Sequence, residues 1–395
     1  MVKLCIITTI PATVRAFMGE QLRYLQQNGF DITIITAYDE IFAKSLPEGV
    51  KYKPVLMTRI VQPWQDIRAF FEILLILRQG KFDIIQYATP KAALLGSLAS
   101  RYAKVPVRLY LMWGLYYVTQ IGFKKFVFKT IEKIVCNCST AIAPDSEGNR
   151  RFAVEEGLCK KDKIEVVGHG SANGVNTSRF DPSKLKKYAK DTRRELGIPE
   201  DAYVFGSIAA LVRDKGVNEM VAAFVEVARK YSNAHLLIIG QTAEKNTVSK
   251  ETLDLIRRHE HIIHIGRQKE PEKYLAAMDA FVLPTYREGF GVVNIEASAM
   301  ELPVISTNVP GPKESIIDGE TGLLVPARAV APIVEAMKRL LGNRDLGKRL
   351  GVAGRQRVLK CYEQKQLWQA IVEHRRRLLM QSGRFEEVEG ELKRV

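Results

Sequence analysis

Short apolar runs alternate with amphipathic stretches through the first half of the chain. Residues 3–9 are mostly apolar, which is typical of a strand buried on both faces of a parallel sheet, and we expect further strands at 31–36 and 83–87. Residues 16–27 and 66–79 lie between them and have the composition of helices. This strand–helix–strand order predicts βαβ units and a parallel sheet.

The same alternation continues to the end of this half. We expect further strands at 105–111, 140–143 and 164–167. Thr89 and Pro90 predict a helix start, with threonine as the N-cap and proline at the first helical position. A second helix start follows at Asp145 or Ser146.

The second half repeats the pattern after a segment, residues 168–185, that is rich in Gly, Asn and Ser and is typical of a linker. We expect strands at 203–211, 234–240, 262–266, 281–284, 304–307 and 322–325, with helices at 218–230, 292–301, 329–341, 345–360 and 364–381. The chain length also favours two domains. The predicted architecture is therefore an α/β protein with Rossmann-like domains at residues 1–180 and 186–363.

The stretch from Tyr286 to Ala297 carries the strongest candidate chemistry. Glu288 precedes a Gly-Phe-Gly loop, and Glu296 lies one turn inside the helix that follows. Gly289 and Gly291 allow a ligand close to the backbone, and a helix N-terminus attracts anions. We interpret the two carboxylates as clamps for hydroxyl groups that flank a diphosphate. The alternative is a solvated glutamate and an acid on a helix surface.

A second turn between a strand and a helix, at residues 213–217, contains Lys215 beside Gly216. A lysine at such a turn suits a diphosphate as a point charge, although a simple turn lysine has the same sequence.

The charge of the chain indicates an anionic partner. The net charge is +15, and residues 1–180 hold 24 Lys and Arg against 15 Asp and Glu. A membrane surface or a diphosphate lipid fits better than nucleic acid, because no zinc finger, aromatic RNA-binding motif or helix-turn-helix is present. Residues 120–133 are cationic and aromatic, and Phe123, Phe126 and Ile131 can share one helical face. We favour a helix on an anionic lipid surface over a core-facing helix with a solvated lysine face.

Other features of composition indicate the compartment. The five cysteines form no CxxC pair and no disulfide framework, and no apolar segment is long enough to span a membrane. The apolar run at residues 4–9 is too short for a signal sequence. We therefore expect a cytoplasmic protein that is peripheral on the inner face of the cytoplasmic membrane.

The Glu288–Glu296 stretch resembles the E-x7-E motif of the family 4 retaining glycosyltransferases. These have the GT-B fold, in which two Rossmann-like domains face each other across a cleft. The resemblance continues through Glu296-Ala297-Ser298-Ala299-Met300, Leu302-Pro303-Val304-Ile305, Gly311, Glu314 and residues 318–326. It implies that helix 364–381 crosses back onto the first domain.

Within that family, the chain is similar to bacterial enzymes that add sugars to polyprenyl-diphosphate-linked glycans. The matching segments are Arg15-Ala16-Phe17, Thr89-Pro90-Lys91-Ala92, Gly114-Leu115 and residues 170–176. Trp113 stands where the family usually has histidine, and an indole donates hydrogen bonds but does not accept them. Trp113 is either a platform for a sugar or a packed core aromatic. Ala209 and Ala210 stand where the family usually has glycine and arginine, and Arg213 is a candidate to replace the missing cation.

The resemblance implies roles for individual residues. The implied donor site consists of Arg213, Lys215, Glu288, Phe290, Gly291, Val292 and Glu296. Lys215 and Glu288 are the catalytic candidates. Lys215 would stabilise negative charge on the leaving diphosphate, and Glu288 would hold a hydroxyl of the donor sugar. Glu296 would hold the ribose, and Arg15 and Trp113 would bind the acceptor. No cofactor and no metal are expected, because the chain has no Asp-x-Asp triplet and its histidines form no ligand pattern.

We therefore expect a retaining glycosyltransferase of the EC 2.4 class. It would use a nucleotide sugar, UDP-linked by family frequency, and a lipid-linked glycan acceptor in bacterial polysaccharide assembly. Two alternatives remain open. One is a non-catalytic GT-B subunit that binds a glycan or a partner, which the residues Trp113 and Ala210 favour. The other is a GT-B sugar-nucleotide epimerase.

Overall fold

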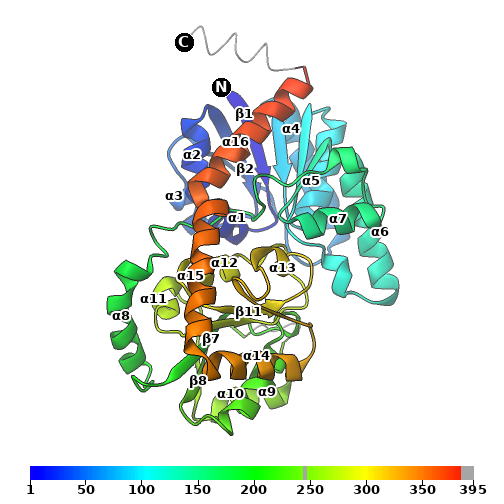
Figure 1. Ribbon diagram of the computed structural model, residues 1–395. Helices are drawn as coiled ribbons and strands as arrows, with labels where there is room; N and C mark the ends of the chain where they lie inside the picture. Colours follow the sequence, from blue (N-terminus) through cyan, green and yellow to red (C-terminus); the bar gives the residue numbers. More distant parts are fainter. Residues whose placement is uncertain (243–246, 384–395) are drawn as a thin grey trace. The chain divides into compact units, whose positions relative to one another are not determined.

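The computed structural model describes residues 1–242 and 247–383. It divides into two compact units, the first made of Met1–Asn173 with the chain from Lys365, the second of Gly174–Gln364 (Figure 1). Each unit contains one six-stranded sheet, and every strand pair in both sheets is parallel.

The first unit has the strand order β3-β2-β1-β4-β5-β6. Its strands are β1 Val2–Ile7, β2 Phe30–Thr36, β3 Lys51–Pro54, β4 Ile84–Tyr87, β5 Val107–Met112 and β6 Ala141–Pro144. Its helices are α1 Pro11–Phe17, α2 Gln21–Gln27, α3 Glu40–Ser45, α4 Pro63–Gly80, α5 Pro90–Tyr102, α6 Gly122–Cys138, α7 Glu147–Glu155 and α16 Gln364–Gln381, with short 3-10 turns η1 Tyr116–Thr119 and η2 Lys161–Lys163.

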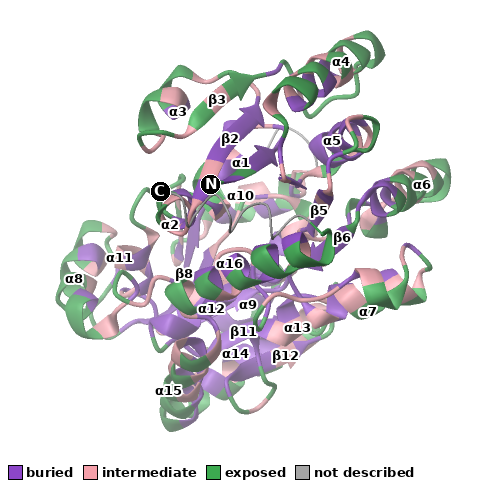
Figure 2. Cartoon of the chain, turned by 90° about the horizontal axis from the view of Figure 1, so that it is seen from above, coloured by how far each residue is buried: buried purple, intermediate pink, exposed green. Residues whose placement is uncertain are grey.

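Alternate side chains of β1 enter two separate cores, one on each face of this sheet. Cys5 and Ile7 pack in a core with residues of α4, α5 and α6. Leu4 and Ile6 pack with residues of α1, α2 and α16. Figure 2 shows the buried strands between these helices and the exposed outer sides of α4 and α6.

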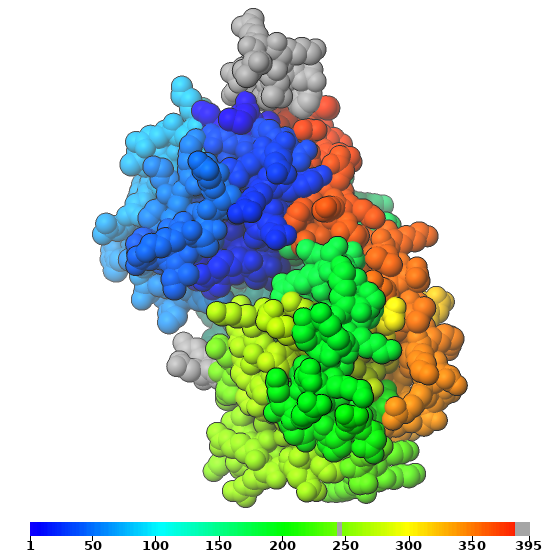
Figure 3. Space-filling view, turned by 90° about the vertical axis from the view of Figure 1, so that its left-hand side faces the viewer, coloured from blue at the N-terminus to red at the C-terminus, as the bar shows by residue number. Residues whose placement is uncertain are grey.

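Helix α16 completes the second of these cores, although it comes at the end of the chain. Trp368 and Val372 are buried there, and Tyr24 donates to Gln369 over 2.8 Å. In Figure 3 the red and orange residues of this helix lie beside the blue residues of the first strands and helices. The predicted return of helix 364–381 to the first domain is therefore what the structure has.

The second unit has the strand order β12-β11-β10-β7-β8-β9. Its strands are β7 Tyr203–Ile208, β8 Ala234–Ile239, β9 Ile262–Ile265, β10 Ala280–Leu283, β11 Val304–Thr307 and β12 Gly322–Val325. Its helices are α8 Pro182–Glu195, α9 Val217–Ala228, α10 Lys250–Arg258, α11 Pro271–Leu275, α12 Val292–Ala299, α13 Pro312–Ser315, α14 Val330–Gly342 and α15 Arg344–Cys361, with the 3-10 turn η3 Arg213–Lys215. Phe205 faces a core shared with α9 and α14, and Val204 faces one shared with α12 and α15.

Two predicted elements differ in the structure. The helix expected at 16–27 is two helices, because the chain turns at residues 18–20 and α1 already begins at Pro11. The strand expected at 164–167 does not form. Only Ile164 bridges to Ile142, after which the chain turns through Gly168 and Gly170, both at positive φ.

The boundary between the units also lies elsewhere than at residues 180 and 186. The first unit ends at Asn173, because Val175 already bridges to Glu363 and Phe180 is buried in a core of the second unit. Residues 182–185, expected in a linker, are the first turn of α8.

Candidate functional site

Two loops of the second unit meet at the carboxyl ends of β7 and β10, which are neighbours in the sheet. Gly216, after η3, has φ +69°, and a Cβ there would lie 2.0 Å from the carbonyl oxygen of Pro284. The backbone carbonyl of Asp214 accepts two hydrogen bonds from this loop. One comes from the hydroxyl of Thr285 at 2.9 Å and the other from the backbone N–H of Tyr286 at 2.8 Å. Only glycine permits this approach, and it brings the Lys215 turn against the Glu288 loop.

Lys215 and Glu288, the two catalytic candidates, form an ion pair across these loops. Lys215 Nζ donates to Glu288 Oε1, and both side chains remain partly accessible to solvent. A second pair, Arg287 with Asp214 at 3.2 Å, fastens the same two loops. The structure therefore places a cation and a carboxylate together at the sheet edge.

Arg213 is exposed on η3, on the same turn as Lys215. Its charge acts on the phenol of Tyr286, which donates to Glu219 over 2.5 Å. Burial and this carboxylate raise the pKa of Tyr286. Arg213 thus adds positive charge on the same turn as Lys215.

Helix α12 begins at this edge, with Gly291 as its N-cap at φ +84°. Val292 is the first helical residue and is half-buried. The ring of Phe290 points into the core instead, where it is 2% exposed and makes an edge contact with Tyr362. The side chain of Phe290, which was expected in the donor site, is therefore engaged in packing.

Buried polar contacts hold α12 in place. Asn294 donates from Nδ2 to the hydroxyls of Ser306 and Ser315, over 3.0 and 3.1 Å, which joins α12 to β11 and α13. Gly311, before α13, approaches the Glu288 loop so closely that a Cβ would lie 2.5 Å from the carbonyl oxygen of Gly289. Three loops after adjacent strands therefore fix the start of this helix.

Glu296 lies on α12 in an environment that disfavours its charge. Burial raises its pKa to about 7, Glu272 adds to the rise, and Arg179 opposes it. Arg179 is held by Glu272 through two bonds, Nε to Oε1 at 2.9 Å and Nη2 to Oε2 at 2.8 Å. The sequence interpretation missed this pair beside Glu296, because its partners are 93 positions apart and belong to no motif.

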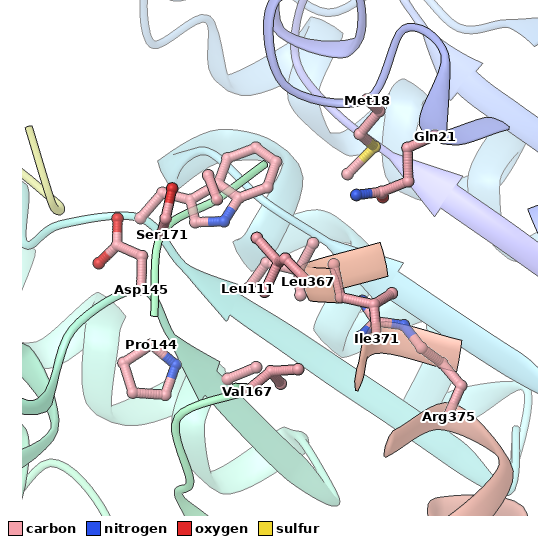
Figure 4. A pocket seen from close by; sticks show the side chains of 13 residues that line it. Met18, Gln21, Leu111, Pro144, Asp145, Val167, Ser171, Leu367, Ile371 and Arg375 are labelled. Atoms are coloured by element: carbon pink, nitrogen blue, oxygen red, sulfur yellow. The ribbon is translucent and has the colours of Figure 1, made fainter. Parts of the chain in front are cut away.

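The first unit has a pocket of its own at the carboxyl ends of β5 and β6, and Figure 4 shows the side chains that line it. Its space for water-sized groups is about 30 Å³. It is lined by Met18, Gln21, Leu111, Trp113, Ala143, Pro144, Asp145, Val167, Ser171, Ala172, Leu367, Ile371 and Arg375.

The pocket contains one of the two predicted acceptor residues. Trp113 lines it and packs on Phe17 with ring centroids 5.0 Å apart. Arg15 is not among the lining residues: its guanidinium pairs with Asp39 at 3.1 Å and lies 5.9 Å from the ring of Phe42. The structure therefore does not bring Arg15 into the pocket with Trp113.

The carboxylate of Asp145, next to the N-cap of α7, lines this pocket. Ser146 caps the helix by accepting from the Asn149 amide, so Asp145 is not needed for that role. The carboxylate of Asp145 accepts from the Asn149 side chain over 3.0 Å and lines the pocket. Ser171 donates its backbone N–H to the Asp145 carbonyl over 2.7 Å from a backbone at φ +74°, which is strained for serine.

Two predicted helix features of this unit differ in detail. Thr89 precedes α5 but makes no capping bond, because its φ is +68° and its hydroxyl lies 2.7 Å from the hydroxyl of Thr9. On α6, Phe123 and Phe126 are exposed as expected, whereas Ile131 packs against a core. Among the described residues, no helix is both long and apolar enough to cross a membrane.

Both parts of the chain match models of known families. Residues 189–357 match "Glycosyl transferases group 1", and residues 7–146 match "Glycosyl transferase 4-like". The capsular polysaccharide biosynthesis glycosyltransferase CapM of Staphylococcus aureus is 31% identical over 92% of this chain and 94% of its own length. An N,N'-diacetylbacillosaminyl-diphospho-undecaprenol alpha-1,3-N-acetylgalactosaminyltransferase of Campylobacter jejuni is 26% identical over 89% and 93%.

The fold has close counterparts among solved structures. Anabaena HepE, solved in complex with UDP and glucose, superposes with a TM-score of 0.77 at 16% identity, over 95% of this chain and 99% of its own. This likeness confirms the predicted GT-B fold class of two Rossmann-like domains. The identity to CapM across almost the whole of both chains, with the two family models, establishes that this protein belongs to the group 1, family 4-like glycosyltransferases.

Proposed function

We propose that this glycosyltransferase moves a sugar from a UDP-sugar to a glycan carried on a polyprenyl diphosphate, with retention of anomeric configuration. The observation that carries the proposal is the assembly of Lys215, Glu288 and the start of α12 at one sheet edge of the second unit. The C. jejuni relative is named for an undecaprenyl-diphosphate-linked acceptor, and HepE was solved with UDP, which makes these the first substrates to test.

Each residue then has a distinct task in transfer. Glu296 holds ribose hydroxyls, and the N-terminal N–H groups of α12 face the diphosphate. Lys215 leaves its pairing with Glu288 to meet the negative charge that develops on the departing diphosphate, a form of stabilisation that usually dominates catalysis. Glu288 is then free of this ion pair and accepts a hydrogen bond from a hydroxyl of the sugar that is transferred. Arg213 supplies further positive charge from the same turn.

Retention follows if the acceptor hydroxyl attacks from the side that the diphosphate leaves. The leaving phosphate oxygen then takes the hydroxyl proton, so that no separate protein base is required. Product anomer analysis by NMR tests this directly: an inverted linkage would reject the retaining assignment.

The acceptor lipid implies work at a membrane surface, and exposed apolar side chains of the first unit support such a surface. Trp64 on α4 is 86% exposed, and Ile121 and Phe123 at the start of α6 are 86% and 79% exposed. Crossover helices run antiparallel to the strands of a parallel sheet, so both helices begin at the carboxyl edge. Lys91, which opens α5, bonds Asp66 of α4 at 2.5 Å and so ties the starts of α4 and α5 together.

The charge of the same region favours an anionic bilayer. Residues 56–138 contain twelve Lys and Arg and four Asp and Glu, a net charge of +8. Aromatic side chains among cations are typical of interfacial binding to anionic lipid. We therefore propose a peripheral location on the inner face of the cytoplasmic membrane.

Vesicle flotation tests this location. Trp64→Ser and Phe123→Ser are expected to lower binding to vesicles that contain anionic phosphatidylglycerol. Val352→Ser, at an exposed apolar position of the second unit, is the matched control. Equal flotation of all three variants and the unmodified protein would reject the proposed surface.

Donor binding and transfer test the central proposal. Nucleotide sugars are screened by thermal shift with Glu296→Ala as control, and the donor that binds is then offered with a polyprenyl-diphosphate glycan. Transfer at the unmodified rate by both Glu288→Gln and Lys215→Ala would reject the assignment. Donor binding without turnover on any lipid acceptor would favour a non-catalytic subunit, and an epimer formed from the donor alone would favour an epimerase.

A further inference from the structure

The pocket of the first unit contains a buried cation that pairs with no carboxylate among the described residues. Arg375 of α16 is 2% exposed and lines the pocket. Its Nη2 donates to Gln86 Oε1 over 2.9 Å, and its Nη1 lies 3.4 Å from His374 Nδ1. Its Nε is buried and has no hydrogen-bond partner among the described residues.

The acidic groups around Arg375 are engaged elsewhere. Glu165 lies near this part of α16, but it contacts His374 Nε2 at 2.8 Å and pairs with Arg377. No ion pair joins Arg375 to any carboxylate in the described part of the chain. Desolvation accordingly lowers the pKa of Arg375 to about 9, so the side chain is still charged at neutral pH.

A buried charge that meets only neutral partners is costly to the folded protein. Natural proteins usually pair such a group or use it to bind a ligand of opposite charge. A guanidinium has five donors in a planar fork, and it binds carboxylate or phosphate oxygens in preference to neutral groups. The unused Nε and the weak Nη1 contact leave part of this fork available.

The shape of the pocket indicates how a ligand would lie. Figure 4 shows Asp145 and Ser171 at one end and Arg375 at the other, with Leu111 and Leu367 between them. The carboxylate of Asp145 repels an anion and attracts a hydroxyl, so a negative group enters at the Arg375 end. A space of about 30 Å³ admits a few atoms of water size, which suits one small oxygen group and not a whole sugar ring.

We propose that the Arg375 end of this pocket is a subsite for an anionic oxygen group, a carboxylate or a phosphate, of the acceptor glycan. Only this group enters the pocket, because the space is too small for the ring that carries it. This inference rests on the proposed function, because the acceptor is taken to bind to the first unit. It adds a charge requirement that selects acceptors.

The test uses small anions as probes on the full chain. Inorganic phosphate and D-glucuronate are titrated separately against sodium chloride at equal ionic strength, and the midpoint of thermal unfolding is followed. Lys215→Ala is the background, so that phosphate binding in the donor site is removed. One of the two probes is expected to raise the unfolding midpoint in a saturable way. A rise with phosphate would identify a phosphate as the ligand group, and a rise with D-glucuronate would identify a carboxylate.

The rise must also depend on Arg375. It is expected to disappear in Lys215→Ala with Arg375→Met and to persist with Arg376→Met, a neighbouring exposed arginine on the same helix. Without ligand, the midpoint of thermal unfolding of Arg375→Met is expected within about 2 °C of that of the Arg376→Met control. Removal of the buried charge stabilises the folded protein, and this gain offsets the cost of leaving the Gln86 oxygen without a hydrogen bond. Arg375→Lys keeps the charge without the fork and should retain a weaker rise.

Three results would overturn this subsite. The first is an unfolding midpoint that neither anion raises above its value in sodium chloride. The second is a rise in the midpoint that persists in Arg375→Met. The third is a large loss of stability in ligand-free Arg375→Met, which would mark the arginine as structural. The proposed function fails on a different measurement in the same assay, the Glu296-dependent rise with a nucleotide sugar. With the natural acceptor, Arg375→Met should raise acceptor KM on the order of tenfold and leave donor KM unchanged.

Discussion

Replacing Glu296 by glutamine should stabilise the ligand-free protein at alkaline pH while it removes donor binding. Burial raises the pKa of this carboxyl from 4.5 to about 7. In the unfolded chain the carboxyl ionises at its ordinary pKa. The folded state therefore binds the proton more tightly, and its stability falls as the pH rises from about 4.5 through about 7. Glutamine resembles the protonated form at every pH and avoids this loss.

The magnitude follows from the pKa shift. A rise of the pKa from 4.5 to about 7 corresponds to about 3 kcal/mol. The side chain keeps some contact with solvent. We therefore expect about 1 to 2 kcal/mol at pH 8 after screening is allowed for. At pH 5 most of the difference should vanish, because the folded carboxyl is protonated there.

The assay is the midpoint of thermal unfolding of the full chain at pH 5 and pH 8. Glu296→Gln should unfold roughly 2 to 6 °C above the unmodified protein at pH 8 and close to it at pH 5. Glu320→Gln, an exposed glutamate of the same unit, is the control for a change of net charge. Donor affinity should fall about 10- to 100-fold in Glu296→Gln, since a charge-assisted bond to the ribose is lost.

Two results would refute this reasoning. A variant that is less stable than the unmodified protein at pH 8 would mean that the ionised carboxylate contributes favourable contacts that outweigh its burial. An equal gain at pH 5 and pH 8 would mean that protonation of Glu296 is not the cause.

Three further predictions concern the same edge of the second unit. Lys215→Ala should lower kcat about 10²- to 10³-fold, with Lys338→Ala as a surface control, and an unchanged kcat would exclude the role in leaving-group stabilisation. Gly216→Ala should cost about 2 to 4 kcal/mol and weaken donor binding, because φ is +69° and Pro284 leaves no room for a Cβ. Gly342→Ala, where nothing lies within 4 Å, should be close to neutral, and equal effects of the two alanines would contradict this account. Transfer assayed with EDTA should proceed at the rate measured without it, and a loss restored by one divalent cation would show a metal requirement.

The order of short apolar segments and amphipathic stretches was enough to predict an α/β fold with parallel sheets, and the resemblance of the motifs added the GT-B class. Residues 3–9 are mostly apolar, which fits a strand in a sheet covered on both sides. Lys215 and Glu288 could be predicted together because each follows a strand, and the carboxyl ends of parallel strands meet at one edge. The topology then brings them into contact across 73 positions.

Other parts of the site depend on contacts that no local pattern contains. Arg179 meets Glu272 only after α8, α11 and α12 are placed around the second sheet, and neither residue belongs to a motif. Phe290 lies within the motif, yet the turn at Gly291 directs its ring into the core. Asp145 resembled a helix cap in the sequence, and the pocket beside it depends on α16, which comes more than 200 residues later.

The position of α16 has a consequence for synthesis of the chain on the ribosome. The second unit is one continuous segment, Gly174–Gln364, whereas the first needs residues from both ends of the chain. The later-made unit can therefore finish folding before the earlier-made one, whose core stays open until Trp368 and Val372 have left the exit tunnel. Loss of a few dozen C-terminal residues would expose apolar surface in the N-terminal half and leave the other half intact. A premature stop codon before residue 365 would then yield a chain whose second unit folds while its unfinished first unit aggregates.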